Sequence, residues 1–179
     1  LPILPLRNTV LFPGVVIPIT AGRDKSIQLI KDANNGKKVI GVVSQKDETI
    51  ENHTVNDIHT LGTIARILRV LQMPDGNTTI IIQGKKRLEV EAMLRENPNM
   101  EANVKEVPET RPENMDEEFK AMLDSIKELA LQIIKESPNI PSEASFAIKN
   151  IESSSFLINF ISSNMNLTVK DKQALLAIT

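Results

Sequence analysis

The chain has 179 residues, of which 41% are hydrophobic, and its formal net charge is -2. This length can bury one good core or two modest ones, so a wholly disordered chain is excluded. There is no cysteine, which excludes a disulfide framework and a thiolate metal site and fits a reducing cytosol. No apolar run approaches the roughly 18 residues that a membrane-spanning helix needs.

The first part of the chain predicts a strand, a turn, a second strand and a helix. Pro13-Gly14 separates apolar runs at residues 10–12 and 15–17, and Pro18 confines the second run to a sheet edge or a bulge. Residues 23–26 open a stretch with helical spacing that Asn34-Asn35-Gly36 closes.

Strand patterns dominate the chain up to residue 107. The short apolar run at residues 39–43 suits a strand buried on both faces. Pro74-Asp75-Gly76-Asn77 has the composition of a turn, so residues 67–71 fold back on 78–83 as a hairpin. Two further strands are expected at 87–93 and 102–107. Residues 1–107 therefore predict a small, partly closed β barrel or two packed sheets with one inserted helix.

The pattern becomes helical in the last third of the chain. Residues 108–115 have a linker composition, and residues 116–179 are expected to form a helical bundle, which makes the fold α+β. Asn114 with Glu117 resembles a capping box at the start of the first helix, which Pro138 and Pro141 end. Ser142 is expected to cap a second helix. A serine run at 153–155 precedes a third, and Thr168 with Asp171 caps a fourth.

The opening segment also resembles a known family. The string RN-VLFP-G, followed by P and then by GR-K-S, is similar to the start of the N-terminal domain of Lon-type ATP-dependent proteases. Further matching points follow in the same order, at Gly41-Val42-Val43, Gln45-Lys46-Asp47, Asp57-Ile58-His59, Leu61-Gly62-Thr63, Ala65, Pro74-Asp75-Gly76, Gly84, Arg87 and the stretch 157–176.

This resemblance implies a PUA-like β domain and a helical subdomain, placed ahead of a long helix, an AAA+ ATPase and a Ser-Lys protease module. It implies a cytoplasmic homohexamer whose ATP and Mg²⁺ belong to the later domains. The start Leu1-Pro2-Ile3 is neither a signal peptide nor an initiator methionine, so we read the chain as an excised piece.

No catalytic motif is found in the sequence. There is no Walker A motif, and no serine lies in a Gly-flanked turn that would activate its hydroxyl. His53 and His59 are six residues apart in a polar stretch with no third ligand at a recognised interval, so surface or loop histidines are expected rather than a metal site. The chain is therefore expected to bind rather than to catalyse, without a cofactor of its own.

Three places are candidates for contact with a substrate protein. Phe12, Val15 and Ile17, around Pro13, form a strip that an incomplete sheet edge could expose. Met73 and Pro74 at the hairpin tip offer a second, adaptable contact. Each group also has a purely structural reading, as barrel core or turn.

The third place is Arg23-Asp24-Lys25, a charged triplet that by itself reads as a solvated first helical turn. The resemblance associates the GR-K-S segment with telling substrates apart, and Gly22, Arg23, Lys25 and Ser26 match it. Lys85-Lys86-Arg87 is read as a solvated turn beside a strand.

The sequence thus predicts a domain that recognises unfolded or degron-bearing proteins. Two alternatives remain open, a separate adaptor that carries substrates to a protease and an RNA-binding module of PUA-like fold. All five aromatic residues are phenylalanines, and only Phe12 lies in the strand-rich part, so a basic, base-stacking groove is not expected.

Overall fold

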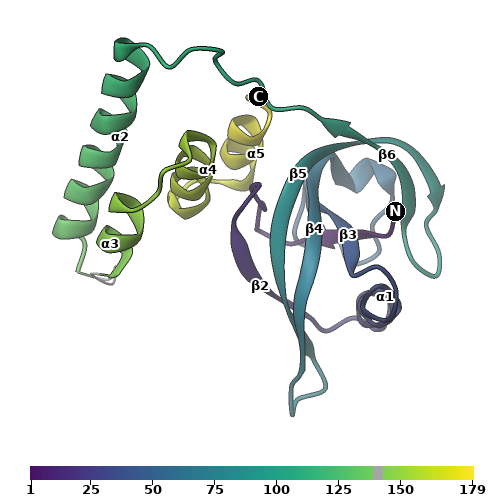
Figure 1. The fold of residues 1–179 in the computed structure, drawn as a ribbon. Helices are drawn as coiled ribbons and strands as arrows, with labels where there is room; N and C mark the ends of the chain where they lie inside the picture. The colour runs from purple at the N-terminus through teal and green to yellow at the C-terminus, as the bar shows by residue number, and fades with distance from the viewer. Residues whose placement is uncertain (139–142) are drawn as a thin grey trace.

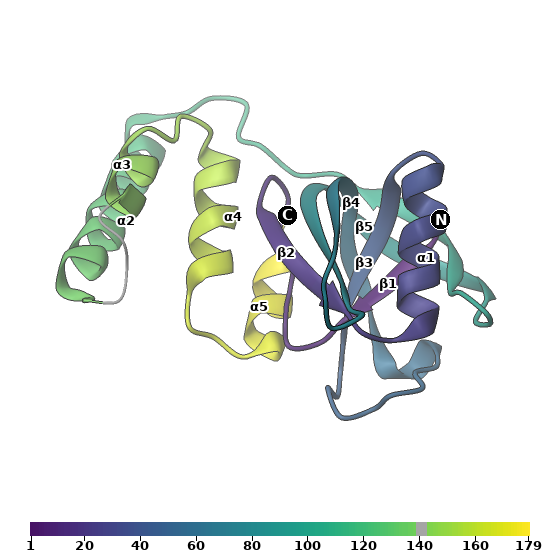
Figure 2. The same cartoon turned by 90° about the horizontal axis from the view of Figure 1, so that it is seen from below.

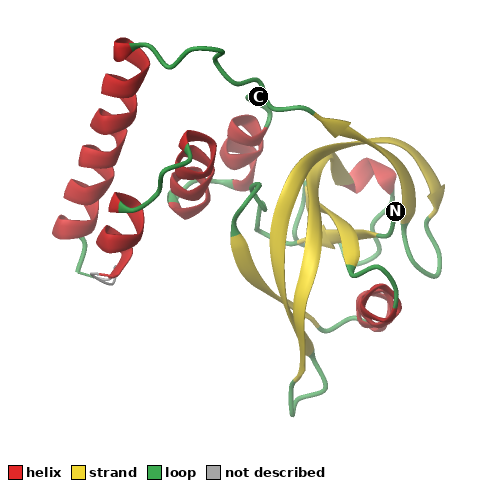
Figure 3. Ribbon diagram, in the orientation of Figure 1, coloured by secondary structure: helices red, strands yellow, loops and turns green. Residues whose placement is uncertain are grey.

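A computed structural model describes residues 1–138 and 143–179 of the chain. It shows a curved sheet with one helix beside it, followed by helices that extend away from the sheet (Figures 1 and 3). The α+β class predicted from the sequence is confirmed. The expected roles of Pro141 and Ser142 at helix ends lie outside the described residues. Within the described residues, no helix is long and apolar enough to cross a membrane.

Six strands form one mixed sheet in the order β1-β3-β4-β5-β2, with β6 also paired to β5. The strand bounds are Ile3–Leu6 (β1), Val16–Ala21 (β2), Val39–Gln45 (β3), Ile58–Gln72 (β4), Thr78–Arg95 (β5) and Glu101–Val107 (β6). The long strand β5 pairs with β4 along one edge, and its other edge carries β2 at one end and β6 at the other.

The sheet curls into a barrel that closes at one end and stays open at the other. At the closed end β1 meets β6, where Leu1 and Ala102 exchange hydrogen bonds of 2.9 and 3.0 Å and Ile3 N donates to Met100 O at 2.9 Å. At the open end β1 and β2 are the two edges and do not pair. Pro18 lies in β2, so the prediction that it marks a sheet edge is confirmed, as is the prediction of a partly closed barrel.

The tight turn between β4 and β5 follows its sequence signal. Gly76 adopts φ +88°, which favours glycine, and the Asp75 carboxylate accepts from the Asn77 N–H at 3.0 Å. The resulting hairpin projects past the body of the sheet (Figure 1). The predicted hairpin is therefore confirmed.

Residues 10–12 do not form the strand that their apolar run predicts. Val10, Leu11 and Phe12 form a buried loop, and β1 lies earlier, at Ile3–Leu6. The loop is tolerated in the core because side chains satisfy its backbone: Thr63 Oγ1 donates to Leu11 O at 2.6 Å, and Ser44 Oγ donates to Thr9 O at 2.6 Å. The turn at Gly14 is present, with φ +80°.

The predicted inserted helix is α1, Asp24–Asn35, and Gly36 is its C-cap. It buries Leu29, Ile30 and Ala33 against the barrel, which matches the spacing of these residues. A short 3₁₀ turn, η1 at Val55–Asp57, leads into β4.

Among the described residues, four more helices follow the barrel: α2 (Glu117–Glu136), α3 (Glu143–Lys149), α4 (Ser154–Asn164) and α5 (Val169–Leu176). Asp116, not Asn114, caps α2, because its carboxylate accepts from Phe119 N at 2.8 Å, so the expected capping box is wrong. The predicted cap of α5 is confirmed: Thr168 Oγ1 accepts from Asp171 N at 3.1 Å. Ser153, in the predicted serine break, caps α4.

The helices fall into two groups by their distance from the barrel (Figures 1 and 2). Helices α4 and α5 lie beside the barrel, whereas α2 and α3 form an arm that stands away from it (Figures 1 and 2). Leu176 of α5 belongs to the barrel core, and Phe156 of α4 packs against it. Gln173 Nε2 also donates to Leu61 O at 2.7 Å.

Arg87 joins the barrel to these helices. The expectation of a solvated turn at Lys85-Lys86-Arg87 is wrong, because all three residues lie within β5, although Lys85 and Lys86 are exposed as expected. Arg87 is only 5% exposed. Its guanidinium donates to Leu176 O at 2.8 Å, Glu109 Oε1 at 3.1 Å and Asn159 Oδ1 at 3.2 Å. Burial raises the pKa of the Glu109 carboxyl, but the hydrogen bonds from Ser155 and Arg87 and the charges of Arg87 and Arg111 outweigh it and hold that pKa below its ordinary value.

Candidate functional site

The expected apolar strip around Pro13 is largely absent from the surface. Phe12 and Val15 are 1% and 5% exposed and belong to the barrel core, while Ile17 is half-buried and packs against that core. The apolar side chains of this segment point inward because the loop at residues 10–12 closes one face of the barrel. Exposure of Phe12 and Val15 was therefore wrongly expected, and Pro13 is only partly exposed.

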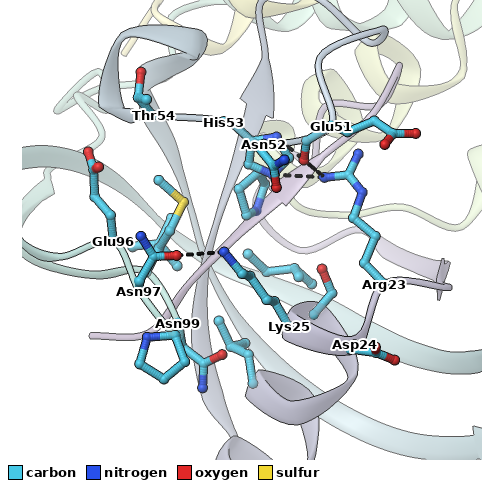
Figure 4. A pocket seen from close by; sticks show the side chains of 17 residues that line it. Arg23, Asp24, Lys25, Glu51, Asn52, His53, Thr54, Glu96, Asn97 and Asn99 are labelled. Carbon is cyan, nitrogen blue, oxygen red and sulfur yellow. Dashed lines mark hydrogen bonds between the residues drawn. The ribbon is translucent and has the colours of Figure 1, made fainter.

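Arg23, Asp24 and Lys25 line a pocket of about 600 Å³. Its walls are residues 3–5 of β1, the start of α1, the loop at residues 51–54 and the loop at residues 96–100 (Figure 4). Four segments far apart in the sequence thus meet at one place. The charged triplet gives this site its sequence signal, but nothing local in the sequence indicates the two loops that complete it.

Arg23 turns into this pocket instead of pointing to solvent. Its Nη1 donates to Glu51 O at 2.8 Å and lies 3.0 Å from Nε2 of His53. The other side of the His53 ring meets Gln45, whose Nε2 lies 3.1 Å from Nδ1. Arg23, His53 and Gln45 therefore form a connected cluster that sequence reasoning missed, because it treated His53 as an isolated loop residue.

The pKa of the His53 ring lies below its ordinary value in this cluster. Burial is the largest cause that lowers it, and the charges of Arg7 and Lys25 lower it further, against an opposing backbone contact with Ile50. A neutral ring accepts at one nitrogen only, so it accepts from Arg23 Nη1 or from Gln45 Nε2 but not from both, whereas a protonated ring would repel the guanidinium of Arg23. The geometry and the lowered pKa therefore agree.

Lys25 and Asp24 point in different directions from the first turn of α1. Lys25 Nζ crosses the pocket and donates to Asn97 Oδ1 at 2.5 Å, while the Asp24 carboxylate points away from it (Figure 4). Both side chains are exposed. Lys25 is thus available to a partner in the pocket, and Asp24 faces solvent beside the pocket.

Exposed apolar side chains gather on the β4–β5 hairpin. Leu68, Leu71 and Met73 are 49%, 39% and 43% exposed, and Pro74 at the tip is also exposed. We call these four residues the hairpin surface. This surface lies next to the charged triplet. Gly22, the residue before Arg23, packs so closely against Asn77 of the hairpin turn that a Cβ at Gly22 would lie 2.7 Å from Asn77 Oδ1. The predicted contacts at Met73 and at Arg23 therefore lie at the same end of the barrel.

A second exposed apolar surface lies on the arm formed by α2 and α3. Met122, Leu129 and Ile133 are 54%, 60% and 61% exposed and lie on one face of α2, and Phe146 of α3 is 73% exposed. We call these four residues the arm surface. The apolar repeat of α2 covers more than one face of the helix. This width is the sequence signal that some of its apolar side chains are exposed.

The described residues contain no group of three or more histidine, cysteine, aspartate or glutamate side chains placed to hold a metal ion. His59 lies in β4, away from the cluster around His53. Burial and, to a smaller degree, Lys46 lower its pKa. The side chains of the candidate surfaces offer hydrogen bonds, charges and apolar contacts.

A family model described as the ATP-dependent protease La (LON) substrate-binding domain matches residues 1–179. This chain belongs to that family. A Lon protease of Flavobacterium johnsoniae is 71% identical over 178 residues, which are 99% of this chain and 22% of that protein. A Lon protease of Cytophaga hutchinsonii is 52% identical over 98% of this chain and 22% of that protein. The Lon-type resemblance seen in the opening segment is thereby confirmed.

Solved structures agree on the fold of this Lon substrate-binding domain. The N-terminal domain of a Mycobacterium avium complex Lon protease matches with a TM-score of 0.76 at 24% identity, over 99% of this chain and 90% of that chain. A Lon N-terminal domain protein from Xanthomonas campestris matches with a TM-score of 0.68 at 17% identity. The chain spans about a fifth of the length of the curated relatives that it matches.

Proposed function

We propose that this domain recognises unfolded or degron-bearing proteins and delivers them to the ATPase ring of a Lon-type protease for degradation in protein quality control. In this proposal the domain itself does not catalyse. ATP and Mg²⁺ are used, and peptide bonds are cut, by other domains of a cytoplasmic homohexamer. The proposal rests on the family membership and on one structural observation, the hairpin surface.

The hairpin surface has the properties that binding of unfolded chains requires. Leu68, Leu71 and Met73 expose apolar area on a projection that the rest of the barrel does not cover. Contiguous apolar area at a protein surface commonly marks a binding site, and methionine adapts its shape to dissimilar partners. Unfolded proteins display the apolar side chains that such a surface takes up.

In this proposal the charged pocket makes the binding of unfolded chains selective. Lys25 is exposed and lines the pocket together with Arg23, and Gly22, just before them, lies against Asn77 in the hairpin turn. A client that reaches the hairpin surface therefore also meets these two cations. Electrostatic contacts of this kind discriminate between partners more than they add affinity.

A single site of this size binds weakly, and a ring of copies compensates for that weakness. Each additional copy that holds the same client converts a second encounter into an intramolecular one, with effective concentrations in the ~mM range for short flexible links. We therefore expect weak binding by the isolated domain and firm capture by the assembled enzyme. Tight binding of an unfolded protein by the isolated monomer would contradict this account.

The decisive experiment changes Arg23 and Lys25 together to glutamate in the full-length protease. We expect a changed ranking of degradation rates among several unfolded substrates, with unchanged ATP hydrolysis. The matched control changes Lys31 and Lys37 to glutamate, which alters the charge equally at exposed residues outside the pocket. An unchanged ranking in the Arg23 and Lys25 variant would remove these residues from the site.

A second variant tests the hairpin surface. Replacing Leu71 and Met73 by serine removes exposed apolar area without opening the core. We expect slower degradation of all unfolded substrates alike, because this contact is not selective. Unchanged rates would show that the hairpin surface does not hold clients.

A further inference from the structure

Two neighbouring hollows lie at the open end of the barrel, and we call them together the groove. The pocket of about 600 Å³ is joined by a second hollow of about 380 Å³, and Leu4, Pro5, Arg23 and Ser26 line both. The second hollow lies between the two unpaired edge strands, with residues 4–7 of the β1 segment on one side and residues 18–21 of β2 on the other. The groove therefore runs along β1 from the point where β6 leaves it.

The edge of β1 that faces this groove has a carbonyl without a matching donor at Pro5. Pro2 O accepts from Gly41 N of β3 at 2.8 Å, whereas Ile3 N points the other way, to Met100. Because main-chain groups alternate in direction along a strand, Pro5 also points away from β3, and Arg7, just after the strand, lines the same hollow. Pro5 has no N–H, so it offers only its carbonyl to the groove.

The edge of β2 has the same gap, at Pro18. Gly84 N donates to Val15 O at 2.9 Å, and the register then directs Ile17 and Ile19 toward β5. Pro18 and Thr20 therefore direct their main-chain groups to the free edge. Pro18 again supplies a carbonyl without an N–H. Two prolines thus stand on opposite sides of the open seam, which helps to explain why β1 and β2 do not pair.

The groove wall also holds one donor and one acceptor without partners. Arg23 Nη2 and Gln45 Oε1 are buried and have no hydrogen-bond partner among the described residues. Gln45 is only 3% exposed, and both residues line the hollow between the edge strands. They contact the same His53 ring, so the two free atoms belong to one cluster. Buried polar atoms normally have partners, and exceptions call for an explanation.

We propose that this groove binds an extended segment of client polypeptide through its main chain, as an added strand between β1 and β2. The inference rests on the proposed function and deepens it, because it names the bound part of the client as main chain. A peptide group carries one N–H and one C=O, and these are the partners that Gln45 Oε1 and Arg23 Nη2 lack. Both atoms are out of reach of solvent, so small side-chain movements accompany binding.

The two prolines determine which segments fit. The carbonyls of Pro5 and Pro18 face the groove without matching N–H groups, so the bound strand must supply the donors. A client segment with free amides satisfies this need, whereas a segment with proline or N-methylated amides does not. Added strands of this kind draw affinity from main-chain hydrogen bonds and depend little on side-chain identity. Such recognition suits a domain whose clients share no sequence.

The test uses a ¹⁵N-labelled sample of this chain and a short capped peptide of alternating valine and serine. The comparison peptide has the same side chains and N-methylated amides. We expect the first peptide to shift the amide signals of Arg7, Thr20 and Arg23 and to slow hydrogen exchange at Arg7 and Thr20. We expect the N-methylated peptide to weaken these effects by about tenfold or more. Equal effects of both peptides on these residues would overturn main-chain recognition.

A variant tests the position independently. Ser26 lines both hollows and makes no side-chain hydrogen bond among the described residues, so S26W obstructs the junction and S26A is its matched control. We expect S26W to weaken peptide binding by about tenfold or more and S26A to leave it within about twofold. If S26W fails to fold, the peptide comparison on the unaltered chain still decides.

The outcomes separate this proposal from the function that it deepens. Peptide-induced shifts confined to Leu71 and Met73, with none at Arg7 or Thr20, would overturn the groove and leave the hairpin surface as the client site. Absence of binding by both peptides, together with unchanged degradation by the full-length variants described above, would overturn both proposals.

Discussion

The barrel and the arm differ in how far their apolar side chains are buried. In the barrel, Phe12, Ile80 and Ile82 are at most 1% exposed. In the arm, α2 is described in full and buries Ile134 alone, while Leu129 is 60% exposed. The difference shows that an amphipathic pattern predicts a helix but does not show how much of its apolar face is covered. We expect the barrel to set the stability of the domain.

The largest expected effect is that of emptying the barrel core. Phe12→Ala removes a fully buried ring between the loop and the sheet, and such changes cost about 3–5 kcal/mol of unfolding free energy. Urea unfolding followed by circular dichroism measures it. The matched change in the arm, Leu129→Ala, is expected to stay within about 0.5 kcal/mol because the side chain is exposed. A loss in the arm as large as in the barrel would show that the arm surface is packed in solution.

The next effect concerns the joint between the barrel and helices α4 and α5. Arg87→Met leaves Glu109, Asn159 and the Leu176 carbonyl without their shared donor, at a cost of about 2–3 kcal/mol. Hydrogen exchange should accelerate in α5 more than in α2, which makes no contact with Arg87. Uniform acceleration of both helices would mean that Arg87 supports the whole fold rather than this joint.

Helix caps give a smaller effect that also separates the two regions. Thr168→Ala removes the cap of α5, which packs on the barrel, and should lower the global unfolding free energy by about 1 kcal/mol. Asp116→Ala removes the cap of α2 in the arm. Its effect should appear as faster local exchange in the first turn of α2 with little change in the urea midpoint. The reverse pattern would contradict the separation of arm and barrel.

The smallest effect is a pH dependence that belongs to the barrel. The pKa of His53 lies below its ordinary value of 6.5, chiefly because of burial, and burial also lowers the pKa of His59. Between the lowered pKa and 6.5 the unfolded chain binds more protons than the folded one. The contribution of these histidines to the unfolding free energy is therefore greatest above about pH 6.5, and it is lost as the pH drops through that window.

Urea midpoints at about pH 7.5 and about pH 5.5 measure this dependence, since both values bracket histidine titration. The change should shrink in the H53Q/H59Q variant. Asp47 and Asp57 also have lowered pKa values, but they titrate below 3.8 and so affect stability only in stronger acid. A pH dependence that is unchanged in the double variant would assign the effect to other groups.

Local signals made much of the fold predictable. The glycine in the turn at Gly76, the cap at Thr168 and the helical spacing of α1 act within a few residues, and each prediction is confirmed. The loop at residues 10–12 was mistaken for a strand because its backbone is satisfied by Ser44 and Thr63, which are distant in sequence. Arg87 was misread for the same reason, since its partners lie in the linker, α4 and α5.

The candidate site was only half visible in the sequence. Arg23 and Lys25 form a charge pattern, and Met73 lies in a recognisable turn, so these were singled out. The groove depends on the curl of the sheet, which brings β1 opposite β2 and places His53 and Gln45 behind Arg23. Exposure of Phe12 and Val15 was misjudged because periodicity does not reveal which side of a segment the barrel covers.

Pro5 and Pro18 have one further consequence, for how the domain behaves among copies of itself. An open barrel has two unpaired strand edges. Each edge can pair with a strand of a neighbouring copy, and repeated pairing of this kind leads to aggregation, especially at high local concentration. A missing amide hydrogen in the middle of each bare edge interrupts such a ladder before it can lengthen. The same two proline rings thus help to keep a domain with exposed apolar surfaces dispersed.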